Sequence, residues 1–194
     1  MATLEFFYDF VSPYSYLAST RVEAVATRTG ATIRWRPFVL GGVFKATSNH
    51  APIEIPAKAK HMLLDLDRWS RRLGVPLQFP EAFPFNPILS LRTALAAEAV
   101  GKMAPATHAI YRARWADQRD IADPAVLAAV LTEAGLDGAA LVAAAPNYKE
   151  ALLKQTQEAI DRGAFGAPLF FVGEQLFVGN DRLDFVEEAL RALK

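Results

Sequence analysis

The chain has 194 residues, of which 52% are hydrophobic, so it can bury one sizeable core or a core with a second lobe attached. Its 21 basic and 21 acidic side chains cancel, which argues against a protein that wraps a phosphate backbone. It contains no cysteine, and this excludes disulfides, a thiolate nucleophile of its own and a thiolate metal site.

The sequence indicates neither export nor insertion into a membrane. The first ten residues include Glu5 and lack the basic start followed by an apolar run that is typical of a secretory signal. No stretch approaches the roughly eighteen apolar residues that are needed to cross a bilayer. We therefore expect a cytoplasmic protein whose partners include neither a membrane nor nucleic acid.

The first elements along the chain predict a β-α-β unit. Residues 4–8 are aromatic and apolar and predict a buried strand, and residues 13–29 carry apolar side chains at helical spacing up to Gly30. Residues 32–38 alternate apolar and basic side chains, which is typical of a half-buried strand. Because a helix separates the two strands, we expect them to be parallel.

The middle of the chain, from about residue 52 to residue 162, is rich in alanine and leucine. Proline or glycine separates its helical segments, and nothing in it is typical of a strand. We predict helices near residues 57–74, 87–101, 104–117, 123–134 and 147–162.

The last elements predict a β-hairpin and a closing helix. Residues 168–172 and 175–178 are apolar runs around a Gly173-Glu174 turn, and residues 181–193 place apolar side chains on one helical face. The whole order predicts an α/β sheet domain that is interrupted by a block of helices. We assign residues 1–50 and 163–194 to the sheet domain and residues 51–162 to the inserted helical domain.

The turn between the first strand and the first helix has the sequence Ser-Pro-Tyr-Ser. Ser12 and Ser15 stand where thiol–disulfide enzymes carry the two cysteines of a Cys-x-x-Cys pair. The ordinary explanation is that Ser12 caps the helix and Pro13 occupies its first position. The functional explanation is that a helix start at the carboxyl end of a central strand stabilises an anionic ligand.

Two segments near the end of the chain also have two explanations each. Pro168 either begins an edge strand or follows a cis peptide bond that turns the Ala167 backbone toward a site. Asn180 or Asp181 either caps the last helix or belongs to a second anion site, with the carboxylate beside it to hold an ammonium group.

Taken together, these pieces resemble a known family. The stretches FYDFVSPYSYLA, RPFVLGGVFKATSN, PAKAKHMLLDLDRW and GAPLFFVGEQLFVGNDRLDFVEEAL are similar to those of the 2-hydroxychromene-2-carboxylate isomerases and of their relatives, the kappa-class glutathione transferases. The resemblance covers nearly the whole chain. It implies a thioredoxin-like sheet domain of the DsbA type with an inserted all-helical domain, and it suggests a homodimer.

The resemblance also implies a site for glutathione. In that family the serine of the first motif interacts with the glutathione sulfur, so Ser12 is the expected catalytic residue. The protein would then take from glutathione the sulfur that its own turn lacks. The other expected contacts are Ala167 next to Pro168 for the cysteinyl backbone, Asn180 and Asp181 for the γ-glutamyl end, and Asn49 and Lys58, the lysine being paired with the glycyl carboxylate.

General magnitudes agree with one serine as the group that stabilises a thiolate. Lowering a thiol pKa from about 8.5 to about 6.5 takes roughly 2.7 kcal/mol of preferential stabilisation. A hydrogen bond to a charged group supplies about 1.5–3 kcal/mol, and a helix N-terminus adds about 0.3–1 kcal/mol. Ser12 need not be the nucleophile itself, and His50, His61 and His108 provide neither an obvious base nor a recognised metal-binding pattern.

The implied reaction is the glutathione-dependent interconversion of 2-hydroxychromene-2-carboxylate and trans-o-hydroxybenzylidenepyruvate, a step of aromatic hydrocarbon catabolism. A kappa-like transferase and a non-catalytic thioredoxin-like binding protein are the alternatives. Lys45 either pairs with the carboxylate of the aromatic 2-oxo acid substrate or is a solvated surface lysine. The side chains that either wall the substrate or belong to the core include Phe83 and Trp115, together with Phe79, Phe85 and Tyr111.

Overall fold

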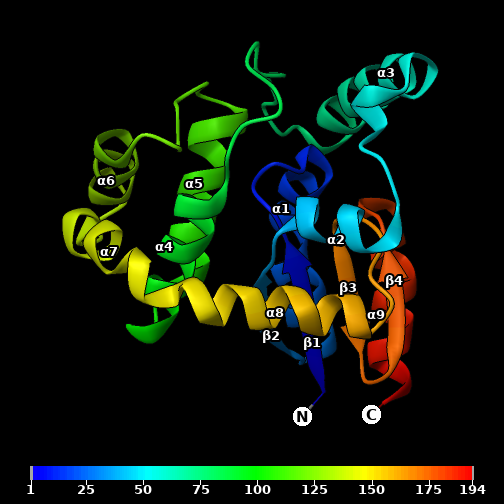
Figure 1. Cartoon of the computed structure of the whole chain (residues 1–194). Helices are drawn as coiled ribbons and strands as arrows, with labels where there is room; N and C mark the ends of the chain where they lie inside the picture. Colours follow the sequence, from blue (N-terminus) through cyan, green and yellow to red (C-terminus); the bar gives the residue numbers. More distant parts are fainter. Residues whose placement is uncertain (1, 194) are drawn as a thin grey trace.

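A computed structural model describes residues 2–193, and within that range four strands form one mixed sheet (Figure 1). Strands β1 (Thr3–Tyr8) and β2 (Thr32–Pro37) are parallel, with Phe6 opposite Trp35. Strand β3 (Leu169–Val172) is antiparallel both to β1 and to β4 (Gln175–Val178). The strand order is β2-β1-β3-β4, which confirms the parallel pair and the hairpin that the sequence predicts.

The helices agree with the predicted segments, with two additions. Helix α2 contains Gly41 and Gly42, which lower helix propensity, and α7 has only seven residues, so neither has a strong pattern in the sequence. The α-helices are α1 (Pro13–Thr29), α2 (Leu40–Thr47), α3 (Pro56–Leu73), α4 (Ile88–Ala99), α5 (Met103–Trp115), α6 (Pro124–Glu133), α7 (Gly138–Ala144), α8 (Lys149–Asp161) and α9 (Leu183–Ala192). Short 3-10 turns cover Pro52–Glu54, Ala145–Tyr148 and Asn180–Arg182.

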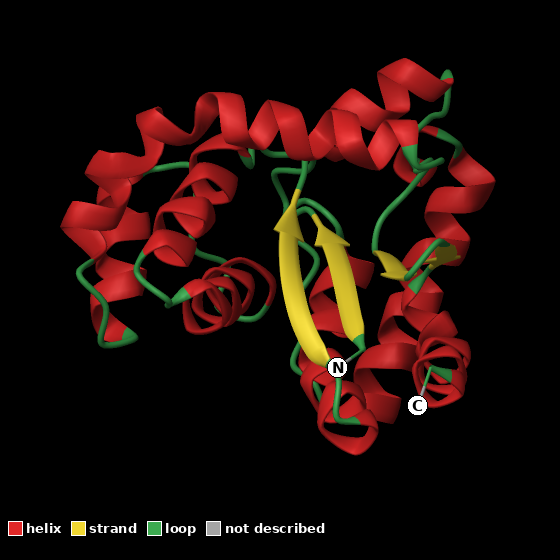
Figure 2. Cartoon of the chain, turned by 90° about the horizontal axis from the view of Figure 1, so that it is seen from below, coloured by secondary structure: helices red, strands yellow, loops and turns green. Residues whose placement is uncertain are grey.

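Helices cover both faces of the sheet because side chains on β1 alternate between the faces. Leu4, Phe6 and Tyr8 pack with side chains of α1, α9, α4 and α5, and the Phe6 ring stacks on Phe170 with their centroids 5.2 Å apart. Phe7 packs on the other face with side chains of α2 and α8. Figure 2 shows the strands with helices on either side.

One large cluster of buried side chains joins the sheet to α4 and α5, so the helices between β2 and β3 share their core with the strands. The division into a sheet domain and an inserted helical domain, with its boundaries, stays a prediction. None of the helices in the described part of the chain combines the length and the hydropathy needed to cross a bilayer.

Helix α5 fixes the turn between β1 and α1. The Tyr111 hydroxyl donates a hydrogen bond to the carbonyl oxygen of Asp9 at 3.0 Å, and Trp115 Nε1 donates to the carbonyl oxygen of Phe10 at 2.8 Å. Both side chains are fully buried. A segment without regular structure must find partners for its peptide groups, and here two side chains one helical turn apart provide them.

We expect Tyr111→Phe to lower the free energy of unfolding by about 1 kcal/mol, because it removes a buried hydrogen bond and almost no volume. Urea unfolding of the two proteins measures the difference. Tyr148→Phe is the matched control, because the described residues provide no hydrogen-bond partner for the Tyr148 hydroxyl. Equal losses in the two variants would contradict a special role for the Tyr111 hydroxyl.

Candidate active site

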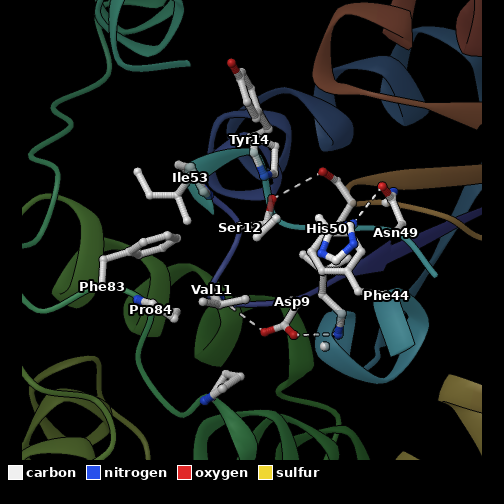
Figure 3. A pocket seen from close by; sticks show the side chains of 18 of the residues that line it. Asp9, Val11, Ser12, Tyr14, Phe44, Asn49, His50, Ile53, Phe83 and Pro84 are labelled. Atoms are coloured by element: carbon white, nitrogen blue, oxygen red, sulfur yellow. Dashed lines mark hydrogen bonds between the residues drawn. The ribbon is translucent and has the colours of Figure 1, made fainter. Parts of the chain in front are cut away.

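A cavity of about 580 Å³ lies beside the turn that follows β1. Its lining comes from segments that are far apart in the sequence. They are the turn after β1 with the start of α1, the first half of α2, residues 49–54, the first turns of α3, the proline-rich residues 83–88, the loop before β3 and Val178 at the end of β4. In Figure 3 Ser12 lies between Phe83 and Ile53 on one side and His50 and Asn49 on the other.

Ser12 is the N-cap of α1 and also lines the cavity. Its Oγ accepts a hydrogen bond from the Ser15 amide at 3.1 Å and donates one to the carbonyl oxygen of Ala167 at 3.3 Å. Pro13 follows at the first helical position, where a missing N–H leaves no bond unmade. The capping explanation is therefore confirmed, and the same geometry places the hydroxyl in the cavity at the N-terminus of a 17-residue helix.

The loop before β3 meets Ser12 through Ala167. The Ala167–Pro168 peptide bond is cis, and Ala167 lines the cavity. Pro168 lies outside the lining, and its carbonyl oxygen accepts a hydrogen bond from the Gly179 amide at 2.9 Å. Strand β3 lies between β1 and β4, so Pro168 does not begin an edge strand.

Asn49 connects two loops at the rim of the cavity. Its Nδ2 donates to the carbonyl oxygen of Phe165 at 2.7 Å, and its Oδ1 accepts from the His50 amide at 2.9 Å. His50 Nδ1 is in turn 3.3 Å from Glu54 Oε2. Asn49, His50 and Glu54 all line the cavity, and the bond from Asn49 to Phe165 holds the segment after α2 against the loop before β3.

The two lysines that the sequence suggested differ in position. Lys58, in the first turn of α3, lines the cavity and has no ion-pair partner among residues 2–193. Lys45, on α2, is exposed and lies outside the cavity lining. The structure therefore offers Lys58 as a cation for an anionic ligand in the cavity. It places Lys45 on the surface, as the alternative reading expected.

The opposite side of the cavity is apolar. Phe83, Pro84 and Phe85 lie in the segment between α3 and α4, and the Phe83–Pro84 peptide bond is cis. The Phe83 ring packs on Phe79 with a centroid distance of 4.8 Å. Trp115 is not part of this wall: it is fully buried behind it, 6.1 Å from Phe83 between centroids, and the expected contact with substrate is corrected accordingly.

Asn180 and Asp181 also lie outside the cavity lining, although Val178 close by belongs to it. Asn180 is buried, its carbonyl oxygen accepts a hydrogen bond from Arg21, and its Nδ2 has no hydrogen-bond partner among the described residues. The Asp181 carboxylate is 3.5 Å from Arg182 and half exposed. They precede α9, which begins at Leu183, so neither is its N-cap.

Asp9 is a cavity residue that the sequence analysis did not single out. It is fully buried, and its carboxylate accepts hydrogen bonds from the amides of Val11 at 3.1 Å and Leu40 at 2.8 Å. Burial raises the pKa of this carboxyl to about 7, although the amide hydrogen bonds act in the opposite direction. The signal in the sequence was an acid directly after a buried aromatic strand.

In the described part of the chain, no three His, Asp or Glu side chains lie together as a metal site would require. Of the histidines, His61 lies on α3 outside the cavity, and His108 is 2.9 Å from Glu23. The cavity thus combines a hydroxyl at a helix N-terminus, one free cation and an apolar wall. This arrangement suits a ligand with an anionic or thiol part and an aromatic part.

Comparison with known proteins identifies the family. The model of the DsbA-like thioredoxin domain matches residues 3–191. A 2-hydroxychromene-2-carboxylate isomerase of Sphingobium xenophagum is 36% identical over 192 residues, which cover 97% of each chain. The chain belongs to the 2-hydroxychromene-2-carboxylate isomerase family. The predicted α/β fold, a thioredoxin-like sheet combined with helices, is confirmed.

Other relatives place this isomerase-family chain beside the kappa transferases. An isomerase of the same name from Pseudomonas putida is 32% identical, covering 98% of this chain and 95% of the relative. Glutathione S-transferase kappa 1 of Homo sapiens is 27% identical, covering 97% and 90%. A solved structure of a 2-hydroxychromene-2-carboxylate isomerase superimposes with a TM-score of 0.89 at 30% identity, covering 98% and 95%.

Asp9 gives this family member a stability that depends on pH. Because burial raises the pKa of Asp9 from 3.8 to about 7, the folded chain holds that proton more tightly than the unfolded chain does. The stabilisation is therefore complete below about pH 4 and is lost as the pH rises through about 7. One proton corresponds to a slope of about 1.4 kcal/mol per pH unit in that window.

Urea unfolding of the wild type and of Asp9→Asn across this window measures the effect. As the pH rises, the wild type should lose unfolding free energy relative to Asp9→Asn. The reason is that Asp9 releases its proton, whereas the asparagine amide does not titrate. All other groups cancel in the difference. Parallel curves for the two proteins would show that Asp9 titrates alike in the folded and unfolded chain.

Proposed function

We propose that this protein is a glutathione-dependent isomerase that interconverts 2-hydroxychromene-2-carboxylate and trans-o-hydroxybenzylidenepyruvate in the cytoplasmic catabolism of aromatic compounds. The proposal includes glutathione as cofactor and a homodimer as the working form. The observation that carries it is the position of Ser12. Its hydroxyl lies at the N-terminus of α1 inside a cavity with one polar and one apolar side.

The polar side of the cavity suits glutathione. Ser12 supplies a hydroxyl, the Ala167 backbone supplies peptide groups, and Lys58 supplies a cation for the glycyl carboxylate. A tripeptide thiol needs this combination of donors, acceptors and one positive charge. Asn180 and Asp181 would serve the γ-glutamyl end if the peptide extends past Val178, and Asn180 Nδ2 is a donor with no protein partner among the described residues.

Ser12 contributes by favouring the thiolate of the bound tripeptide over the thiol. Its Oγ donates to the Ala167 carbonyl at the long distance of 3.3 Å, so the hydroxyl can turn to a stronger, charged acceptor. The helix N-terminus adds to this preference. When bound, glutathione supplies a nucleophile that adds reversibly to the conjugated double bond of the substrate and so permits rotation about it.

The apolar side of the cavity suits the aromatic ring of the substrate. Phe83, Phe85 and Ile53 offer flat and branched apolar surfaces, and together with Pro84 they keep water away from the reacting carbon atoms. A cavity of about 580 Å³ lies within the usual range for small-molecule sites. Phe83 is therefore our choice for substrate contact, and Lys45 would reach the substrate carboxylate only if its side chain turns toward the cavity.

We expect Ser12→Ala to slow the glutathione-dependent conversion of 2-hydroxychromene-2-carboxylate by about ten- to a hundredfold, because a hydrogen bond to the thiolate is lost. The absorbance of the substrate, followed with and without glutathione, measures the rate. Ser19→Ala is the control. Ser19 is buried in the same helix and its hydroxyl bonds to the carbonyl oxygen of Tyr16 at 2.7 Å, away from the cavity.

Conversion by the wild type without glutathione, or full activity of Ser12→Ala, would contradict the proposal. Loss of the N-cap also lowers stability by about 1 kcal/mol, so the folded fraction of each variant is measured by urea unfolding before the rates are compared. A protein that neither converts the substrate nor binds glutathione would leave the non-catalytic scaffold as the remaining alternative.

We expect Lys58→Met to weaken glutathione binding by about fivefold, because an exposed charge pair is worth up to about 1 kcal/mol. Calorimetric titration measures the Kd, and added salt should reduce the difference between wild type and variant. Lys60→Met is the matched control, since Lys60 is exposed on the same helix and lies outside the cavity lining. Equal effects of the two substitutions would remove Lys58 from the site.

A kappa-type transferase is the second candidate, because relatives named glutathione S-transferase kappa 1 match nearly the whole chain. The two activities use the same thiolate and differ in its fate. An isomerase returns glutathione unchanged, whereas a transferase keeps the carbon–sulfur bond and releases a conjugate. Mass spectrometry of glutathione after turnover, with the chromene and with a general electrophile as substrates, separates them.

A further inference from the structure

Asp9 binds both walls of the polar part of the cavity. Its Oδ1 accepts from the Val11 amide in the Ser12 turn, and its Oδ2 accepts from the Leu40 amide at the start of α2. The Asp9 carbonyl oxygen also accepts from the Ser12 amide at 3.0 Å. Figure 3 shows the carboxylate below Ser12, with bonds running to both segments.

Helix capping alone does not explain an aspartate at this position. The N-cap of α2 is Val39, whose side chain makes no capping bond, so the acceptor for the Leu40 amide comes from a residue 31 positions earlier. A serine or aspartate at position 39 would cap α2 without a fully buried carboxyl. A buried carboxyl is unfavourable unless it is well bonded, and here its two oxygens bond two segments that both line the cavity.

We propose that Asp9 is a positioning residue that locks the Ser12 turn to the start of α2 and thereby holds the Ser12 hydroxyl in the orientation that stabilises a bound thiolate. It does not touch the reacting atoms. The part that concerns the thiolate rests on the proposed function, whereas the lock itself is a property of the free protein. Tyr8 and Tyr111 are buried near Asp9, and the charge of Asp9 adds to the burial that raises the pKa of both hydroxyls.

Amide hydrogen exchange in the free protein tests the lock. In the wild type, the amides of Val11 and Leu40 should be protected, and exchange of either at the rate of an open peptide would overturn the proposal. In Asp9→Asn the side chain keeps one acceptor oxygen and presents an NH₂ group to the other amide. At least one of the two amides should then exchange about tenfold faster.

Ser90→Ala is the control for a general loss of stability. Ser90 is fully buried on α4, and its hydroxyl bonds to the carbonyl oxygen of Ile121 at 2.7 Å, outside the cavity lining. This variant should leave the exchange of the Val11 and Leu40 amides as in the wild type. If it accelerates them as much as Asp9→Asn does, the lock is only a consequence of global stability and the proposal fails.

The thiol pKa of bound glutathione tests the consequence for the site. The ultraviolet absorbance of the thiolate, followed against pH, should show that the pKa in Asp9→Asn is higher than in the wild type by about one unit, a tenfold smaller thiolate fraction. The Kd of glutathione, measured about one pH unit below the thiol pKa of the wild-type complex, should change less than about twofold, since both proteins then bind mainly the protonated thiol. Ser90→Ala should match the wild type.

An unchanged thiol pKa in Asp9→Asn would overturn the positioning role. A lowered pKa would overturn it as well, because it would mean that the negative charge of Asp9 affects the thiolate more than its positioning of Ser12 does. If the wild type binds no glutathione, the proposed function fails by itself. The exchange experiment then still decides whether Asp9 joins the Ser12 turn to α2.

Discussion

The hydrogen bonds that hold residues 9–12 are the constraint on which the site depends. This segment belongs to neither β1 nor α1, so its peptide groups need partners from elsewhere. Tyr111 and Trp115 on α5 take two of its carbonyl oxygens, and the Asp9 carboxylate takes the Val11 amide. Helix α5, one of the helices between β2 and β3, therefore fixes the backbone that leads to Ser12. The Ser12 hydroxyl faces the cavity.

The two sides of the cavity come from different parts of the chain, and this separation gives them different chemistry. The polar side depends on the contact between Asn49 and Phe165, which joins the segment after α2 to the loop before β3. The apolar side comes from residues 83–88, which follow α3. A peptide and an aromatic ring can thus be held against each other, with the Ser12 hydroxyl between them.

Helices and strands with a clear apolar pattern could be predicted from the sequence. Side-chain contacts could not be predicted where the same spacing fits two different contacts equally well. The apolar run of β1 and the helical spacing of apolar side chains on the 17-residue α1 are clear in the sequence, whereas α2 has two glycines and its first amide donates a hydrogen bond to Asp9, far away in the sequence. The spacing of Tyr111 and Trp115 suits a wall for a ligand and a contact with backbone carbonyls equally well. Only the packing shows that Trp115 faces the Phe10 carbonyl.

In the proposed reaction the glutathione thiolate would share a cavity with the buried carboxyl of Asp9, because Ser12 and Asp9 both line it. An ionised carboxylate behind Ser12 would oppose a thiolate in front of it, because like charges in a region of low dielectric disfavour each other. Burial raises the pKa of Asp9 to about 7, so the carboxyl is mostly neutral well below that pH and about half ionised near it. Two effects of Asp9 therefore oppose each other in the pH range where a thiolate forms: its charge disfavours the thiolate, whereas its hydrogen bonds to the amides of Val11 and Leu40 hold the Ser12 turn in place and favour it. The positioning role requires that the second effect be the larger.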